Sequence, residues 1–169
     1  MKTSLTPLRR DLLIGYLAVA AVAAHMLEAT LPGLGPWFKP GLANVFTVVA
    51  FFYLDREAAI WVALIRVLGG SLAMGAFLTP SFFLSGAGML GAIVVMLLPP
   101  LPGMGAVGLS ILMALAHMCA QVAAAHLLFV QHSGLFYLLP WFLLGAWCTG
   151  WFNGVLAHGL LHTLRQHKV

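Results

Sequence analysis

The sequence has very few charged residues. Of its 169 residues, 7% are Asp, Glu, Lys or Arg, whereas 62% are hydrophobic. Soluble domains carry roughly 25% charged residues, so a chain this apolar can be solvated only by lipid. We therefore expect an all-α integral membrane protein. Its length allows a single transmembrane domain of about six helices, because each spanning helix needs roughly 20 residues.

Patterns for catalysis and metal binding are also scarce. Cys119 and Cys148 lie inside apolar runs without a CxxC spacing, so neither a disulfide framework nor a metal site is predicted. His158 and His162 share a helix face, but no nearby acidic residue or cysteine completes a set of ligands. The four carboxylates of the chain form no Asp-rich motif, and there is no glycine-lysine phosphate loop. We expect a protein that is not an enzyme.

The distribution of positive charge predicts which side of the membrane the ends of the chain face. The net charge of +4 is too small to indicate nucleic-acid binding, and in a membrane protein it reports orientation. With six spans both termini share one side, and only Lys39 lies on the other. The positive-inside rule therefore predicts cytoplasmic termini. The cations on the terminal side are Lys2, Arg9, Arg10, Arg56, Arg165 and Lys168.

Six apolar segments alternate with turns. We expect spans at about 11–30, 42–54, 57–77, 82–98, 106–130 and 135–161. The second is about 13 residues or roughly 20 Å long, short of the roughly 30 Å hydrocarbon core. Either its helix extends back through Trp37 across Pro40, or it is a partial helix whose start faces a protein-lined cavity. Irregular backbone at membrane depth is tolerated only in the second setting.

Small residues at four-residue spacing mark places where another helix can approach closely. Ala20 and Ala24 form such a pair in the first span, and Gly150 and Gly154 form another in the last. The glycine-rich stretch 85–91 in the fourth span indicates close packing or an irregular backbone.

Two charged residues, Glu28 and Arg66, fall well inside the predicted spans. Arg66 lies nine residues after Glu57, roughly 14 Å along a helix and near the bilayer centre. An arginine at that depth costs about 2.5–3.5 kcal/mol and therefore faces the bundle interior with a partner. One interpretation is that Arg66, helped by Lys39, meets an anionic or carbonyl-bearing ligand. The other is that it pairs with Glu28 or with backbone carbonyls for packing.

Two polar residues of the fifth span, His117 and Gln121, are four apart and share a helix face. They could contact a ligand together with Asn44 of the second span. The alternative is a hydrogen bond that joins two helices and has no ligand.

Five segments of the chain match a known pattern. They are 39–44 (KPGLAN) with Thr47, 66–71 (RVLGGS), 85–86 (SG), 116–117 (AH) with Gln121, and 145–150 (GAWCTG). Together they resemble the family known both as Gx transporters and as heptaprenyl diphosphate synthase component I. The resemblance covers residues 18–154, and Pro40, Met118 and Ala120 depart from the family pattern.

The resemblance implies a six-helix fold similar to the S components of energy-coupling-factor vitamin transporters. In those proteins, alanines on the first helix dock onto a transmembrane coupling protein, and Ala20 and Ala24 match that feature. Members are also linked with flavin-dependent extracytoplasmic electron transfer and with isoprenoid quinone synthesis.

We therefore expect a bacterial inner-membrane protein that binds a small polar or anionic molecule, flavin- or vitamin-like. It would work with an energy-coupling protein and an ATPase, because the chain has no nucleotide site of its own. Two alternatives stay open: an accessory membrane subunit of an isoprenoid synthesis system, and an assembly factor for a membrane redox complex. The candidate binding residues are Glu28, Lys39, Asn44, Arg66, His117 and Gln121.

Overall fold

The computed structural model describes residues 6–30, 41–99 and 102–166, the side chains at 29 and 30 excepted. Within these ranges the chain is helical and contains no strand, which confirms the all-α prediction. A π-helical turn, His126–Val130, and a 3-10 helix, Ser133–Leu138, join the last two α-helices. The α-helices are α1 (Pro7–Thr30), α2 (Ala43–Tyr53), α3 (Arg56–Ala73), α4 (Pro80–Leu97), α5 (Ala106–Ala125) and α6 (Leu139–Gln166).

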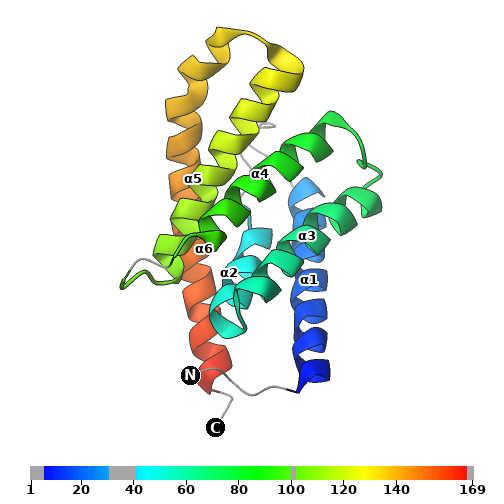
Figure 1. The fold of residues 1–169 in the computed structure, drawn as a ribbon, viewed down its shortest axis with the longest axis vertical. Helices are drawn as coiled ribbons and strands as arrows, with labels where there is room; N and C mark the ends of the chain where they lie inside the picture. Colours follow the sequence, from blue (N-terminus) through cyan, green and yellow to red (C-terminus); the bar gives the residue numbers. More distant parts are fainter. Residues whose placement is uncertain (1–5, 31–40, 100–101, 167–169) are drawn as a thin grey trace.

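The helices run alternately up and down a single bundle (Figure 1). The start of α1 and the end of α6 lie at one end, which we call the terminal end. The α3–α4 and α5–α6 connections lie at the opposite end, which we call the distal end. The described ends of the chain therefore share one side of the molecule.

Among the described residues, four segments are long and apolar enough to cross a membrane. They make the chain a multi-pass membrane protein. The 11 residues of α2 span only about 17 Å, and α3 carries Arg66 in its second half. That α2 and α3 complete six spans stays a prediction. The four segments are Pro7–Glu28, Pro80–Leu97, Ala106–Val130 and Ser133–Gln166.

Local backbone geometry sets the ends of several helices. Gly41 has a φ of 72°, a left-handed conformation that interrupts a helix, and α2 begins two residues later. Of the two alternatives for the second span, the structure therefore shows the short helix. Gly75, with a φ of 64°, follows the end of α3, which stops at Ala73, four residues before the expected end of the third span. The sixth helix begins at Leu139, after the 3-10 helix.

The short helix α2 lies at the centre of the bundle and packs against α1, α3, α5 and α6. Val48, Val49 and Ala50 on it are completely buried. Apolar burial of this kind holds α2 in place even though it is too short to be stable alone. The central position brings its first turn into the interior of the bundle.

Glycines allow the outer helices to approach one another. A Cβ atom at Gly150 would come within 2.9 Å of Cα of Ile111, and one at Gly154 within 2.6 Å of Cα of Val107. The expected packing role of this GxxxG pair is confirmed, and its partner is α5. Gly91 of the glycine-rich stretch packs equally closely on α5, within a regular α4.

Charged residues join helices at the terminal end. The guanidinium of Arg10 makes two hydrogen bonds of 3.1 Å to the carboxylate of Asp55 and one of 3.0 Å to Glu57. Asp55 also caps α3 by accepting a 2.8 Å hydrogen bond from the amide of Ala58. Arg56 donates to the carbonyls of Leu97 and Leu98 at the end of α4. These contacts fix the start of α3 against α1 and α4.

Candidate functional site

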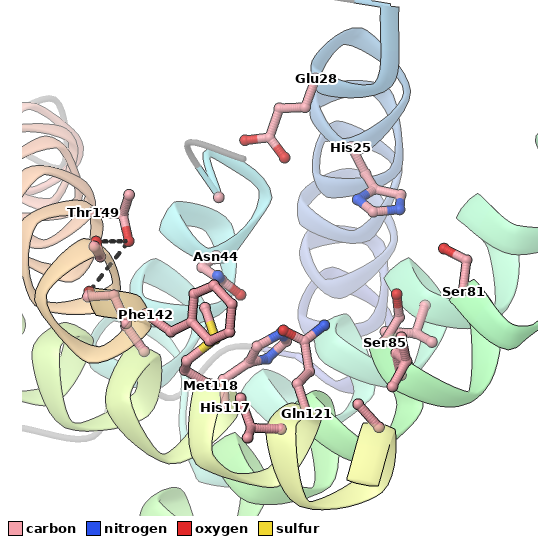
Figure 2. Close-up of a pocket in the computed structure, with 18 of the residues that line it drawn as sticks. His25, Glu28, Asn44, Ser81, Ser85, His117, Met118, Gln121, Phe142 and Thr149 are labelled. Carbon is pink, nitrogen blue, oxygen red and sulfur yellow. Dashed lines mark hydrogen bonds between the residues drawn. The ribbon is translucent and has the colours of Figure 1, made fainter. Parts of the chain in front are cut away.

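A cavity of about 330 Å³ lies inside the distal half of the bundle. All six α-helices contribute to its wall, from the parts that lie toward the distal end. Figure 2 shows Glu28 and His25 of α1 facing the same space as Asn44 of α2 and His117 and Gln121 of α5. The volume is in the range of small-molecule sites in proteins.

The start of α2 is fixed by contacts from two other helices. A carboxylate oxygen of Glu28, on α1, accepts a hydrogen bond from the backbone N–H of Leu42. The side-chain amide of Asn153, on α6, donates a 3.1 Å hydrogen bond to the carbonyl of Gly41. The Leu42 N–H and the Gly41 carbonyl belong to the irregular backbone before α2. Without these contacts, both groups would lack a hydrogen-bond partner at membrane depth. Gly41 and Asn44 both line the cavity.

Arg66 connects α3 to the first turn of α2. Its Nη1 donates a 2.7 Å hydrogen bond to Oδ1 of Asn44, and the residue is only 6% exposed. Its Nε has no hydrogen-bond partner among the residues that the structure describes. A guanidinium has five N–H donors, so this environment leaves donor capacity on a buried cation at the cavity wall.

Glu28 and Arg66 do not form a direct salt bridge, since none of the ion pairs among the described residues joins them. The carboxylate is nevertheless close enough for a coulombic attraction to the guanidinium. The described part of the cavity wall thus contains one cation and one anion, from different helices. Among the described residues, the direct hydrogen-bond partner of Arg66 is the Asn44 side chain, and not Glu28 or a backbone carbonyl as expected for packing.

His117 lies at the boundary between the main cavity and a smaller chamber. The chamber has a volume of about 20 Å³, which suffices for one water molecule, and Asn44, Ser110 and Thr149 also line it. The imidazole packs against Gly88 of α4, where any Cβ atom would clash with the ring. Its Nδ1 is buried without a partner. Gln121, one turn along α5, faces the main cavity, so the two residues share a face as their spacing predicts.

The remaining wall combines hydroxyls with apolar and aromatic surface. Ser81 and Ser85 come from the first turns of α4, and Trp141 and Phe142 from the first turn of α6. A ligand with both a polar and an apolar part would therefore find complementary surface. Further apolar lining comes from Val67, Leu84, Met118, Val122 and Leu135.

The structure brings together five of the six predicted binding residues. The sixth, Lys39, lies outside the described residues. Those that line the cavity are Glu28, Asn44, Arg66, His117 and Gln121.

The expected docking pair lies away from the cavity. Ala20 and Ala24 are half-buried on the flank of α1, between the buried Ala21 and the exposed Ala23. Their role in partner docking is not decided by this placement and stays a proposal.

Among the lining residues that sequence reasoning did not propose for binding are His25, Thr149 and Asn153. His25 precedes Glu28 by three residues, so helical spacing alone places both on one face of α1. Asn153 lies directly before Gly154 of the GxxxG pair, and Thr149 directly before Gly150. A polar residue beside a close helix contact is a signal that could have identified these two.

The described part of the chain contains no group of three or more His, Cys, Asp or Glu side chains that could hold a metal ion. His158 and His162 are exposed near the terminal end of α6.

Residues 17–160 match the model of a protein family described as heptaprenyl diphosphate synthase component I. The matched range contains every residue that lines the two cavities. No curated protein and no solved structure matches the chain.

Proposed function

The chain belongs to the heptaprenyl diphosphate synthase component I family, and from this premise we propose that it is a membrane protein that binds and transports a small polar or anionic molecule. The observation that carries the proposal is Arg66. A buried cation with an unused donor, on the wall of a 330 Å³ cavity, is better explained by a ligand than by packing. Ionisable groups in membrane helices are expensive and usually functional.

The cavity size favours a compact ligand over a polyprenyl chain. A cavity of roughly 150 Å³ accommodates benzene, so each carbon needs roughly 25 Å³. The 35 carbons of a heptaprenyl group would by that measure need roughly 900 Å³. The observed volume of about 330 Å³ corresponds to a ring system or a short chain with a polar end.

The charge distribution supports uptake toward the cytoplasm. Arg9, Arg10, Arg56 and Arg165 all lie at the terminal end of the bundle. On the basis of the positive-inside rule, we propose that this end faces the cytoplasm of a bacterial inner membrane. The cavity, in the distal half, lies nearer to the outer face. We propose that transport depends on an energy-coupling transmembrane protein and its ATPase.

The test is mass spectrometry of small molecules released from the detergent-purified protein, after an absorbance spectrum. We expect a stoichiometric polar compound, such as a flavin or another vitamin, in the wild type and in Arg165→Ala, which changes an exposed cation. Arg66→Ala should lose the compound while keeping a monodisperse elution profile. Arg66→Lys keeps the positive charge. If this variant retains the compound, its loss from Arg66→Ala is due to the missing cation at the site and not to misfolding. Equal retention by wild type and Arg66→Ala would remove Arg66 from the site.

A second candidate follows from the family's description as a synthase component. In that case the chain is the membrane subunit of an isoprenoid-synthesising system, and a soluble partner supplies catalysis. The same experiment separates the two, because a copurifying prenyl lipid or soluble prenyltransferase would favour the second.

A further inference from the structure

The first turn of α2 has the features of an anion site inside the bundle. The N-terminus of a helix carries a partial positive charge. In α2 the amides of Asn44 and Val45 already donate to the carbonyls of Gly41 and Leu42, so the terminus attracts an anion through this charge. In α2 this end lies at the cavity wall, with Asn44 as its second residue. Arg66, more than nine-tenths buried and with a partnerless Nε, is hydrogen-bonded to that residue. A helix terminus and a cation therefore act on the same part of the cavity.

A carboxylate of the chain itself already lies at this place. Glu28 is 5% exposed, lines the cavity, and accepts the N–H of Leu42 directly before α2. It is also the carboxylate that attracts Arg66 electrostatically. Figure 2 shows the carboxylate directed away from α1 toward the space above Asn44. These two interactions are ones that the carboxylate of a ligand would also make.

We propose that Glu28 is an internal competitor of the ligand, whose carboxylate holds the anion position at the start of α2 and is displaced when an anionic ligand binds. This inference rests on the proposed binding function. Two carboxylates in one low-dielectric site repel each other strongly, so the ligand anion and the Glu28 anion exclude each other from the position beside Arg66.

The exchange makes Glu28 a determinant of specificity. An anionic ligand can replace Glu28 at the helix terminus and beside Arg66, whereas a neutral ligand cannot. The apparent affinity for the anion is reduced by the fraction of molecules in which Glu28 still holds the position. The affinity of a matched neutral molecule should not depend on the charge at residue 28.

The probes are 4-nitrobenzoate and its neutral analogue 4-nitrobenzamide, measured by equilibrium dialysis against the purified full-length protein in detergent. Glu28→Gln removes the charge and keeps an oxygen that can accept the Leu42 N–H. It should bind 4-nitrobenzoate at least about tenfold more tightly than the wild type. Binding of 4-nitrobenzamide should change by less than about twofold. Glu57→Gln, the same substitution at an exposed position at the terminal end, should behave as the wild type.

The outcomes separate this inference from the proposed function. Tighter benzoate binding by both Glu28→Gln and Glu28→Ala supports the competition, and the second variant guards against a folding defect in the first. If the wild type prefers benzoate, Arg66→Ala abolishes that preference, and Glu28→Gln leaves it unchanged, the competitor role is wrong and the anion site stands. If no variant distinguishes benzoate from benzamide, the proposed anion site itself is overturned.

Discussion

Nη1 of Arg66 donates a 2.7 Å hydrogen bond to Oδ1 of Asn44, which connects the second half of α3 to the first turn of α2. The two residues are 22 positions apart in the sequence. An arginine inside a membrane bundle requires an acceptor, and the only one that an isolated helix offers is its own backbone. The short helix α2 supplies a side-chain oxygen at the depth of Arg66. It thereby stabilises the cation on which the proposed site depends.

Replacing Asn44 with leucine should destabilise the protein. The substitution removes the acceptor and leaves a buried guanidinium donor unsatisfied, at a cost of about 1–3 kcal/mol. We expect a lower melting temperature in detergent and a loss of ligand binding. Asn44→Asp, which keeps an oxygen at the same place, is the control and should melt closer to the wild type. An unchanged melting temperature for the leucine variant would show that Arg66 does not need Asn44.

Gly41→Ala should disturb the start of α2. Its φ of 72° disfavours any residue with a Cβ atom by about 1–2 kcal/mol. The new Cβ would also lie 3.1 Å from the side-chain nitrogen of Asn153, which donates to the Gly41 carbonyl. Thermal unfolding should therefore start at a lower temperature. Gly86→Ala, in a regular part of α4 with open space around the new Cβ, should be neutral or slightly stabilising.

The contact between α5 and α6 depends on two glycines. Alanine at Gly154 would place a Cβ 2.6 Å from Cα of Val107, and alanine at Gly150 would place one 2.9 Å from Cα of Ile111. Because backbone atoms cannot yield locally, the helices must separate and lose packing. We expect each variant to melt below the wild type and the double variant lower still. Gly159→Ala on the same helix, where no atom lies within 4 Å, should not be destabilised. Equal melting of all three single variants would contradict the close contact.

Much of the candidate site was predictable because charge is rare in this chain. Glu28 and Arg66 are conspicuous in apolar segments, and the shortness of the second apolar segment left two alternatives, one of which was a partial helix that starts inside the bundle. The identity of the direct partner of Arg66 could not be predicted, because it depends on the relative positions of α1, α2 and α3. Spacing along one helix fixes a face, but it does not fix the height of a neighbouring helix.

Other parts of the site depend on irregular backbone. The turn before α6 consists of a π-helical turn and a 3-10 helix, which hydrophobic runs do not specify. It determines that α6 begins at Leu139, and so places Trp141 and Phe142 at the cavity. Ser81 and Ser85 reach the cavity for a similar reason, because α4 begins at Pro80 after a turn with Leu78 at a positive φ.

Asp55 should stabilise the terminal end mainly as a helix cap. Asp55→Ala removes the acceptor for the Ala58 amide and should cost about 0.5–2 kcal/mol. Asp55→Asn retains a capping oxygen and loses the charge that pairs with Arg10. Because the Asp55 side chain is 44% exposed, water and salt weaken that ion pair, and the asparagine variant should melt closer to the wild type. Equal losses for both variants would instead make the ion pair with Arg10 the dominant contribution.

Ala20 and Ala24 provide the test of the proposed coupling partner. Both lie on the flank of α1, which packs against α2 and α3 and leaves part of its surface uncovered. If a transmembrane coupling protein docks there through close helix contact, leucine at either position should prevent its copurification from the native membrane. The matched control is Ala23→Leu, at an exposed position on the same helix. We expect the control to retain the partner, and all three variants to elute as folded protein. Retention of the partner by Ala20→Leu and Ala24→Leu would place the docking surface elsewhere.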